Sequence, residues 1–390
     1  MMSAQSSWTA EEVANIPLSL YMHWPWCVHK CPYCDFNSRG GLFRIDEGRY
    51  IAALLADLSQ VAHTVSRPVT SVFFGGGTPS LMTSEGFDAL MRGIGERVDL
   101  AHDAEITLEA NPGTVTEEKL AAFARSGVTR LSLGVQSFNA ASLSFLGRIH
   151  TARQAREAVT WAKNTFAHVN IDMMYALSGQ TQADLRADAE EAVSFNTDHL
   201  SYYELTIEPG SVFFKRPPEN LPDADTAGDM AECIQTITRK AGFDHYEVSA
   251  YAKAGSRCRH NMTYWTYGDY LAIGAGAHAK ITTPDGAIFR EVRAKSPARY
   301  MTDVENGTFV QRRRRVRPEE IPFEFMLNVL RLREGVAKER WEEATGLPYA
   351  LIAPKVASLQ REGLMEKTDR LAATALGRRF LNTLQERFLP

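Results

Sequence analysis

The chain has 390 residues, of which 44% are hydrophobic and 23% are charged, and its formal net charge is −4 at pH 7. This composition is ordinary for a globular protein, and the length allows one large domain and a smaller one. The slightly acidic balance gives no basic field for nucleic acid, and no apolar run approaches the roughly 18 residues of a membrane helix. We therefore expect neither a nucleic-acid-binding protein nor a membrane-spanning one.

The N-terminal segment carries no secretion signal. Residues 1–16 are polar, include Glu11 and Glu12, and show no basic stretch followed by an apolar one. The chain has five cysteines, three of them clustered, which fits a reducing compartment better than a disulfide framework. We expect a flexible N-terminus over residues 1–17 and a cytoplasmic protein.

Three cysteines follow the first predicted strand with the spacing C-x3-C-x2-C, at Cys27, Cys31 and Cys34. Iron–sulfur clusters are usually held by four thiolates, so three closely spaced thiolates suggest a four-iron cluster with one iron open to a small molecule. Two other interpretations remain from the spacing alone. One is a zinc site with His23 or His29 as the fourth ligand, and the other is a redox pair of the last two cysteines.

From residue 18 to about 250, short apolar segments alternate with amphipathic segments, which predicts alternating strands and helices. Such an alternation indicates a parallel sheet with helices outside it. A closed eightfold barrel usually needs ~250 residues, so about six repeats predict an open, partial (β/α)6 barrel in an α/β fold. The predicted strands are 19–24, 71–74, 105–109, 130–134, 168–174 and 199–207, and the predicted helices are 49–62, 84–98, 116–126, 151–166, 182–195 and 225–241.

Residues that could form a site gather where these strands end. The run Gly-Gly-Gly-Thr-Pro at 75–79 follows the second strand, and glycines let a backbone approach a ligand closely. Glu109, Gln136 and Asp172 lie at or near the ends of the next three strands, and Arg148 follows shortly after the fourth. Each could be a buried polar group with its hydrogen bonds satisfied. Together they favour a ligand site, because parallel sheets bind ligands at the carboxyl ends of their strands.

Past residue 300 the pattern changes. Arg312–Arg315 is a run of four arginines that we interpret as a solvated linker, with docking toward acidic groups as the alternative. Helices at 321–333, 337–345, 348–361 and 375–388, with short strands at 364–367 and 370–373, predict a small winged-helix-like domain. Such domains often bind DNA, but a fold alone assigns no function. The predicted division is a flexible N-terminus (1–17), a barrel (18–250), a barrel extension (251–310) and a C-terminal domain (311–390).

The cysteine motif, with Tyr33 just before its last cysteine, resembles that of the radical S-adenosylmethionine (SAM) superfamily. The string Leu-Tyr-Met-His-Trp-Pro-Trp-Cys with Cys-Pro-Tyr-Cys-Asp-Phe-Asn-Ser is similar to the HemN/HemW branch, and closer to its HemW, or heme-chaperone, type. The resemblance covers residues 17 to 388. It implies a partial barrel and a [4Fe–4S] cluster held by Cys27, Cys31 and Cys34, whose open iron binds SAM. Reduction through such a cluster cleaves SAM to methionine and a 5′-deoxyadenosyl radical.

The resemblance also implies a set of SAM-binding residues. Tyr21 precedes the first cysteine by six positions, as the SAM-contacting tyrosine of the family does, and Glu109 matches an acid that contacts the ribose. The glycine run matches the segment that contacts the methionyl amino group, and Gln136, Arg148 and Asp172 match residues that line a second SAM position in HemN. The full set is Tyr21, Tyr33, Gly76, Gly77, Thr78, Glu109, Gln136, Arg148 and Asp172.

Residues 258–265 contain His-Asn-x-x-Tyr-Trp, which looks like the HemW signature associated with heme binding. A neutral histidine is a common ligand of heme iron, and aromatic rings offer flat faces to a porphyrin. The alternative is a histidine fixed in a loop whose aromatic residues pack the barrel mouth. Cys258 is a rival iron ligand, His278 a weaker one, and Cys233 fits a helix core. The heme candidates are His260, Asn261, Tyr264 and Trp265.

Three functions are compatible with this resemblance: a heme chaperone, an oxygen-independent coproporphyrinogen III oxidase that turns propionates into vinyl groups, and an enzyme that opens or methylates heme. HemN carries a fourth cysteine where this chain has Phe36, and an N-terminal extension for which the residues before the first strand are too few. Both departures argue against the oxidase. We therefore expect a heme chaperone whose cofactors are a [4Fe–4S] cluster, SAM and heme.

The partners that the resemblance implies are heme, a heme donor and heme-acceptor proteins, with membrane-bound respiratory enzymes as candidate acceptors. A flavodoxin or ferredoxin reductant is implied only if SAM is cleaved. SAM and the cluster could instead bias a conformational equilibrium that gates heme transfer or the formation of a homodimer. The arginine run is a candidate contact for heme propionates or for a partner.

Overall fold

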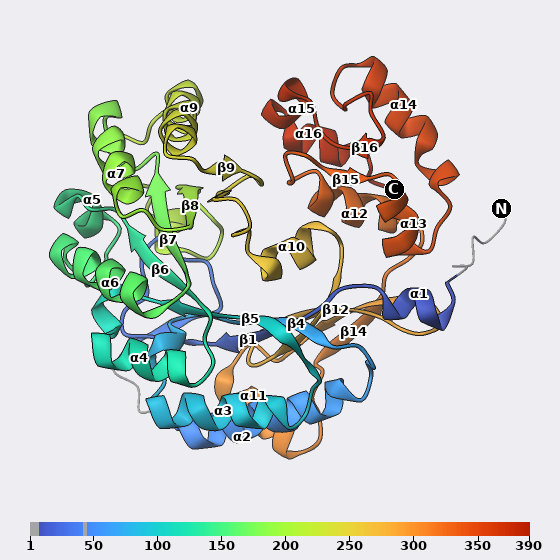
Figure 1. Cartoon of the computed structure of the whole chain (residues 1–390), viewed down its shortest axis with the longest axis horizontal. Helices are drawn as coiled ribbons and strands as arrows, with labels where there is room; N and C mark the ends of the chain where they lie inside the picture. The colour runs from blue at the N-terminus through green and yellow to red at the C-terminus, as the bar shows by residue number, and fades with distance from the viewer. Residues whose placement is uncertain (1–7, 42–44) are drawn as a thin grey trace.

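The computed structural model describes residues 8–41 and 45–390, and its central feature is one large curved sheet (Figure 1). Among the described residues, twelve strands pair in the order β14-β13-β12-β11-β1-β4-β5-β6-β7-β8-β10-β9. The strands from β1 to β8 in this order are all parallel. Their bounds are β1 Leu18–Trp24, β4 Val69–Gly76, β5 Leu100–Ala110, β6 Arg130–Gln136, β7 His168–Tyr175 and β8 His199–Glu204.

Helices join successive parallel strands and cover the convex side of the sheet (Figure 1). The predicted alternation of strands and helices is confirmed. Because β1 and β8 pair with other strands and not with each other, the predicted partial barrel is open. The helices that connect these strands are α2 Glu47–Ala62, α3 Ser84–Gly95, α4 Glu117–Arg125, α5 Ala140–Phe145, α6 Ala152–Thr165 and α7 Gln182–Ser194, with short 3-10 turns η1 Pro79–Leu81 and η2 Pro112–Thr114. Two further helices, α8 Val212–Lys215 and α9 Ala224–Lys240, follow β8.

Side chains alternate between the two faces of each parallel strand, as the geometry of a strand requires. On β6, Leu131, Leu133 and Val135 are fully buried in the main hydrophobic core with the helices. The residues between them, including Arg130 and Ser132, face the concave side and line a cavity. The same division holds on β5, β7 and β8. The convex face of the sheet is therefore an apolar core, and the concave face is polar.

Four strands extend the sheet beyond β1. β11 Asp269–Ile273 is parallel to β1, and the antiparallel strands β12 His278–Thr282, β13 Ile288–Val292 and β14 Arg312–Arg315 follow. Helix α11 Pro297–Glu305 precedes β14 and packs on α2. At the other edge, β10 Ala250–Ala252 is antiparallel to β8, and β9 Asp244–His245 is antiparallel to β10.

The arginine run is exposed to solvent, as predicted, but it is not a linker, because it forms the edge strand β14. Its backbone pairs with β13, and its side chains find partners across the sheet and beyond it. The guanidinium carbon of Arg313 lies 4.2 Å from the ring centroid of Phe289, and Arg314 forms an ion pair of 2.6 Å with Glu320. These contacts compensate the repulsion among the four arginine side chains. Composition alone cannot predict them, because the partners lie on another strand or beyond the run.

Beyond β14 the chain forms a separate group of helices around a second hydrophobic cluster, which includes Phe325 and Trp341. A two-stranded sheet pairs β15 Val336–Ala337 with β16 Arg370–Leu371. The predicted combination of helices and a small wing is confirmed, but the predicted strand at 364–367 is wrong, since only Met365 makes a bridge there. The helices are α12 Ile321–Val329, α13 Glu339–Thr345, α14 Ala353–Arg361, α15 Ala375–Arg379 and α16 Leu381–Glu386, with η3 Tyr349–Leu351.

Part of the predicted flexible N-terminus, residues 1–7, lies outside the described residues. Within the remainder, α1 Ala10–Ala14 begins with a capping box between Thr9 and Glu12, and Val13 and Ile16 are buried. Within residues 8–41 and 45–390, no helix combines the length and the apolar character that crossing a membrane requires. The predicted domain boundaries at 250 and 310 stay predictions.

One helix lies on the concave side of the sheet, in the middle of the curve (Figure 1): α10 Arg259–Trp265. Glu105, at the inward face of β5, holds the start of this helix. One of its carboxylate oxygens pairs with Arg130 at 2.8 Å, and the other accepts from the backbone N–H of Arg259 at 2.9 Å. Arg130 in turn donates to the carbonyl of Ser256 at 3.0 Å. A buried ion pair from two strands therefore replaces the side-chain cap that α10 lacks.

We predict that Glu105→Ala lowers the free energy of unfolding by about 3–5 kcal/mol, because it leaves the guanidinium of Arg130 buried without its counter-ion. The matched control is Asp103→Ala, which removes the exposed ion pair between Asp103 and Arg259 and should leave the free energy of unfolding almost unchanged, because solvent screens such a pair. Urea unfolding followed by fluorescence measures both. Equal effects of the two substitutions would contradict the anchoring role of Glu105.

Candidate functional site

A cavity of about 750 Å³ runs along the concave face of the barrel. Its size lies in the range of small-molecule and cofactor sites. It brings together residues of the cysteine loop, the strand ends and α10, although they are far apart in the sequence. The predicted site residues that line it are Cys27, Cys31, Tyr33, Cys34, Gly76, Gly77, Thr78, Glu109, Gln136, Arg148, Asp172, Asn261, Tyr264 and Trp265; Tyr21 and His260 are not among its lining residues.

Cys27 ends the short strand β2 Trp26–Cys27, and Cys31 and Cys34 lie on the loop between β2 and its partner β3 Arg39–Gly40. The ammonium group of Lys30 closes this loop by donating to the backbone carbonyls of Phe36 at 2.8 Å and of Ser38 at 3.2 Å. Asn37 fixes the loop to the barrel extension by donating to two carbonyls outside it, both at 2.9 Å. The loop is thus held at the carboxyl end of β1, with all three thiols facing one cavity.

The glycine run after β4 has no room for side chains. A Cβ atom on Gly77 would lie 2.6 Å from the carbonyl oxygen of Trp26, and one on Gly76 would lie 2.5 Å from the ring of His23. Gly76 also has a φ of +110°, which other residues rarely adopt. The backbone of this run therefore passes directly against the cysteine loop and forms one wall of the cavity.

Arg148 connects the cysteine loop to the strand ends. Its Nη1 donates to the Sγ of Cys31 at 3.5 Å, and its Nη2 donates to the carbonyl of Gly134 at 2.6 Å and to Asn111. Burial alone would lower the pKa of Arg148. Its neighbours Tyr33 and Cys31 together have the larger, opposite effect, so the pKa is raised above its usual value. The side chain carries a charge into the cavity next to a thiol, which suits an anionic ligand group.

Gln136 ends β6 with a backbone of φ +70°, in the left-handed region that non-glycine residues seldom occupy. The register between β6 and β7 shifts between Gly134 and Gln136, as at a β-bulge. The bulge turns the last side chain of the strand into the cavity. Such backbone strain persists where the surrounding structure enforces it, and it is frequent at ligand sites.

Two partly buried carboxyl groups, Glu109 and Asp172, line the cavity. Burial, helped by the charge of Asp172, raises the pKa of Glu109 from 4.5 to about 8, so Glu109 is largely protonated at neutral pH. Burial also raises the pKa of Asp172, against the hydrogen bonds that it accepts. The Oε2 atom of Glu109 accepts from the N–H of Gly76 at 3.1 Å, which ties it to the glycine run.

Asp172 is oriented by a chain of hydrogen bonds that sequence reasoning missed. Asn170 donates to it at 2.8 Å and Ser132 donates to it at 2.9 Å. The amide oxygen of Asn170 is in turn bonded to the Nδ1 of His199 at 2.7 Å, whose Nε2 contacts the hydroxyl of Tyr246 at 2.9 Å. Asn170 and Asp172 are two positions apart on β7, and Ser132 and His199 lie on the two neighbouring strands. The alternation of polar residues along these strands is the sequence signal that could have found them.

The structure does not bring Tyr21 and His260 to the cavity wall. The hydroxyl of Tyr21 bonds to the Nδ1 of His23 at 3.0 Å, and His260 stacks on Phe73 with its ring nitrogens bonded to Ser71 at 3.2 Å and Tyr264 at 2.8 Å. Burial lowers the pKa of His260 to about 3, so its ring is neutral. In this arrangement His260 offers no free nitrogen to a metal in the cavity, and it positions the hydroxyl of Tyr264 instead.

The aromatic residues of α10 form the wall opposite the polar strands. The ring of Tyr264 stands at 90° to that of Tyr270, with 4.5 Å between the centroids. The guanidinium carbon of Arg331 lies 4.2 Å from the ring centroid of Trp265. The indole Nε1 of Trp265 is buried and has no hydrogen-bond partner among the described residues. Together with Asn261, these rings give the cavity an apolar, flat surface with polar atoms at its rim.

The other candidates from the sequence take different places. His29 lines the cavity, whereas the Nε2 of His23 bonds to the carbonyl of Asn37 at 3.0 Å and its Nδ1 to Tyr21. Cys258 lines the cavity, but burial strongly raises the pKa of its thiol, which contacts Glu105 at 3.5 Å. His278 is exposed on β12, and Cys233 is partly buried on α9 as predicted.

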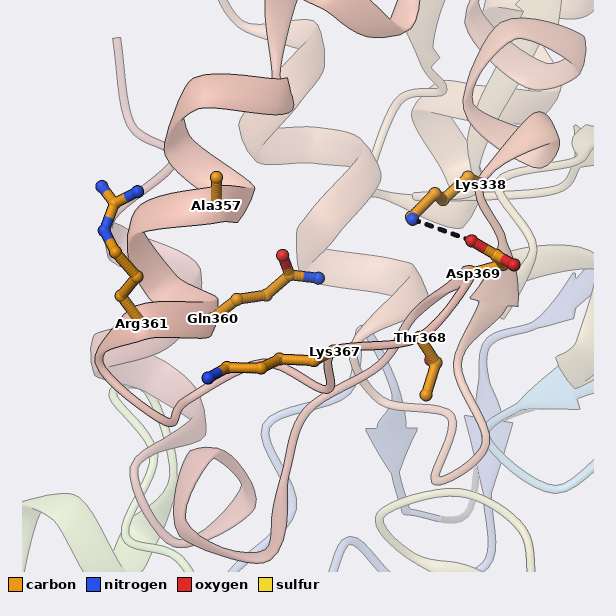
Figure 2. A pocket seen from close by; sticks show the side chains of 7 residues that line it. All are labelled: Lys338, Ala357, Gln360, Arg361, Lys367, Thr368 and Asp369. Atoms are coloured by element: carbon orange, nitrogen blue, oxygen red, sulfur yellow. Dashed lines mark hydrogen bonds and ion pairs between the residues drawn. The ribbon is translucent and has the colours of Figure 1, made fainter.

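A second hollow of about 490 Å³ lies in the C-terminal part, beside α14 (Figure 2). Lys338 and Asp369 form an ion pair of 3.2 Å at one side of it, but the side chain of Asp369 is 99% exposed, so the pair contributes little. None of the predicted site residues lines this hollow. The barrel cavity is therefore the candidate functional site.

Comparisons with known proteins identify the family and the fold of this chain. Residues 21–192 match the model of the Radical SAM superfamily, and residues 316–380 match that of the HemN C-terminal domain. Among solved structures, that of coproporphyrinogen III oxidase (HemN) from Escherichia coli has a TM-score of 0.81 at 21% identity, covering 99% of this chain and 95% of that one. At this identity the likeness shows a shared fold.

Curated relatives are much more similar in sequence. Heme chaperone HemW of Haemophilus influenzae is 43% identical over 380 residues, which cover 96% of this chain and 98% of that protein. Heme chaperone HemW of Escherichia coli K12 is 43% identical over 376 residues with the same coverage. A mitochondrial radical SAM domain-containing protein 1 of mouse is 36% identical and covers 85% of this chain and 77% of its own length. The chain belongs to the HemW family of the radical SAM superfamily.

Proposed function

We propose that this chain is a heme chaperone built on a radical SAM scaffold, which binds heme in the barrel cavity and passes it to acceptor proteins. The observation that carries the proposal is the 43% identity, over nearly the full length, to proteins named heme chaperones. The cavity supports it. Its outer end holds the cysteine loop and the glycine run, and its inner end meets α10 with the flat rings of Tyr264 and Trp265.

Membership of the radical SAM superfamily implies a [4Fe–4S] cluster and SAM. The residues present fit both groups. Three thiols share the cavity mouth, and burial raises the pKa of Cys27 and of Cys34, so the positive charge of bound iron would be needed to hold them as thiolates. Three thiolates leave one iron of such a cluster open. We assign Cys27, Cys31 and Cys34 as its ligands.

The cavity walls next to the cysteines suit SAM. When bound, the cluster and SAM supply one-electron chemistry at the open iron. The chain itself offers a backbone wall at Gly76, Gly77 and Thr78, and acceptors for ribose hydroxyls at Glu109. We assign Tyr33, Gln136, Arg148 and Asp172 to the same end of the cavity. Tyr21 acts behind this wall by positioning His23 against Gly76.

We predict that Cys27→Ala, Cys31→Ala and Cys34→Ala each abolish the cluster, because a three-thiolate site cannot spare a ligand. Anaerobic reconstitution followed by iron and sulfide analysis should give about four of each per wild-type chain and almost none for these variants. Cys233→Ala and Cys258→Ala are the matched controls and should keep the wild-type content. Zinc in place of iron, or full iron and sulfide in any of the three variants, would refute the assignment.

The raised pKa of Glu109 predicts a pH dependence of folding stability. The folded chain holds the proton of Glu109 up to about pH 8, whereas an unfolded chain releases it near pH 4.5, so folding stability falls as the pH rises through this window. Glu109→Gln removes the titration. Its unfolding midpoint in urea, measured without ligands, should therefore exceed that of the wild type at pH 8, by a margin that shrinks toward pH 5.

The control for this experiment is Glu190→Gln, on the exposed face of α7, whose difference from the wild type should not change between pH 5 and pH 8. The proposed burial of Glu109 beside Asp172 is wrong if the margin for Glu109→Gln is the same at both pH values.

For the heme end we assign Asn261, Tyr264 and Trp265 as contacts of the porphyrin, with His260 holding the hydroxyl of Tyr264 at 2.8 Å. A flat ring system can stack on Trp265 on the face that Arg331 leaves open. The structural neighbour HemN is a coproporphyrinogen III oxidase, so radical decarboxylation is the alternative activity. Phe36, 58% exposed beside the cysteines, occupies the position of the fourth cysteine of the oxidase motif.

The test is an anaerobic titration of the reconstituted, SAM-loaded protein with heme, run beside an assay with coproporphyrinogen III and a low-potential reductant. We expect about one heme per chain, transfer to an added apoprotein acceptor, and no vinyl products. Trp265→Ala should weaken heme binding about tenfold, since it removes the stacking surface, while Trp161→Ala on α6 should not. Catalytic turnover to vinyl products without retained heme would establish the oxidase instead.

We further propose a cytoplasmic location, heme-acceptor proteins that include membrane-bound respiratory enzymes, and a heme donor as partners. A flavodoxin or ferredoxin reductant belongs to this set only if SAM is cleaved. SAM-dependent homodimer formation would fit a role of SAM in gating heme transfer. The relatives named heme chaperones support heme and acceptors as partners, and the remaining partners rest on the sequence resemblance.

A further inference from the structure

The barrel cavity extends from the strand ends to the beginning of β6, where it is lined by Arg130 and by Thr107 of the neighbouring strand β5. Arg130 is the first residue of β6 and Gln136 is the last. At about 3.3 Å per residue, they are roughly 20 Å apart along the strand. The cavity therefore has an inner end that lies far from the cysteines and that none of the residues assigned above to the cluster or to SAM occupies.

This inner end carries two buried donors without partners. The Nη1 of Arg130 and the Oγ1 of Thr107 have no hydrogen-bond partner among the described residues, and the two residues are 2% and 1% exposed. The other guanidinium nitrogens of Arg130 are used, by Glu105 and by the carbonyl of Ser256. A buried N–H or O–H group without a partner is costly, so an oxygen atom of a ligand or of water is expected there.

The two free donors are neighbours. Thr107 and Arg130 are direct partners in the register between β5 and β6, and both face the cavity. Adjacent strands lie about 4.8 Å apart, so one small group can contact both side chains. A guanidinium N–H prefers an anionic oxygen, and a carboxylate has two oxygens to share between the donors.

The two donors lie close to helix α10, which carries the residues assigned to the porphyrin. The ion pair of Arg130 with Glu105 anchors α10, and α10 carries the Asn261, Tyr264 and Trp265 contacts assigned to the porphyrin. A porphyrin against this helix thus has its edge close to the inner end. The remaining neighbours there are Cys258, whose thiol burial keeps protonated, and His199, whose pKa burial lowers.

We propose that Arg130 and Thr107 form a carboxylate-binding subsite at the inner end of the cavity, which receives a propionate side chain of the porphyrin. The proposal rests on the proposed heme-binding function and adds to it a determinant of orientation: the carboxylate edge of the porphyrin enters first, toward the beginning of β6. It predicts a preference for porphyrins with free carboxylates over their esters.

Thr107→Val is the informative variant, because it removes an unpartnered hydroxyl and keeps the shape of the side chain. Substitution of Arg130 would also leave the buried carboxylate of Glu105 without its counter-ion and weaken the attachment of α10. The experiment measures the affinity of the reconstituted full-length protein for heme and for heme dimethyl ester. The wild type should prefer heme by about tenfold or more, as charge-assisted hydrogen bonds imply. Thr107→Val should reduce this preference at least threefold, and the control Thr238→Val, a buried hydroxyl on α9, should keep it.

Each outcome decides between the two proposals. A preference for heme that Thr107→Val reduces supports the subsite. Equal binding of heme and ester by the wild type, or a preference that Thr107→Val leaves intact, overturns the subsite and leaves the heme-binding function standing. Binding of neither compound by the wild type overturns the proposed function, and the subsite with it.

Discussion

The alternation of side chains along the parallel strands is the constraint on which the rest of this structure depends. Every second residue of β5 to β8 packs into the apolar core beneath the helices, so the residues between them must face the concave side. Those residues are polar: Glu109, Ser132, Asp172 and His199 among them. The same pattern that buries the convex face thus turns polar side chains of neighbouring strands into one cavity, which is where the ligands of the protein are expected.

A buried ion pair holds α10 against the concave side of the sheet. Glu105 and Arg130 join neighbouring strands and fix the start of this helix. The helix adds the aromatic rings of Tyr264 and Trp265 to the lining of the cavity. Lys30 and Asn37 hold the cysteine loop over the strand ends. The cysteine thiols and the aromatic rings therefore line one continuous cavity, which is the space that the proposed cluster, SAM and heme would share.

Much of this could be predicted from the sequence, because strands, helices and strand-end residues follow from local patterns. The cysteine spacing, the glycine run and the residues Glu109, Gln136 and Asp172 all line one cavity as predicted. What could not be predicted depends on tertiary packing. The side chains of Tyr21 and His260 are hydrogen-bonded outside the lining of the cavity, and their predicted contacts with SAM and heme stay predictions. The arginine run pairs as a strand, and Arg130 and Thr107 become neighbours only through the register of two strands.

The central claim is that one cavity holds the cluster at its cysteine end and heme against α10. Anomalous diffraction at the iron edge, from anaerobic crystals of the reconstituted protein soaked with heme, tests it most directly. The account predicts one iron peak of cluster size at the thiols of Cys27, Cys31 and Cys34, and a second, single-iron peak in the same cavity beside Tyr264 and Trp265. A heme iron outside the cavity, on the protein surface or between two molecules, would contradict the account.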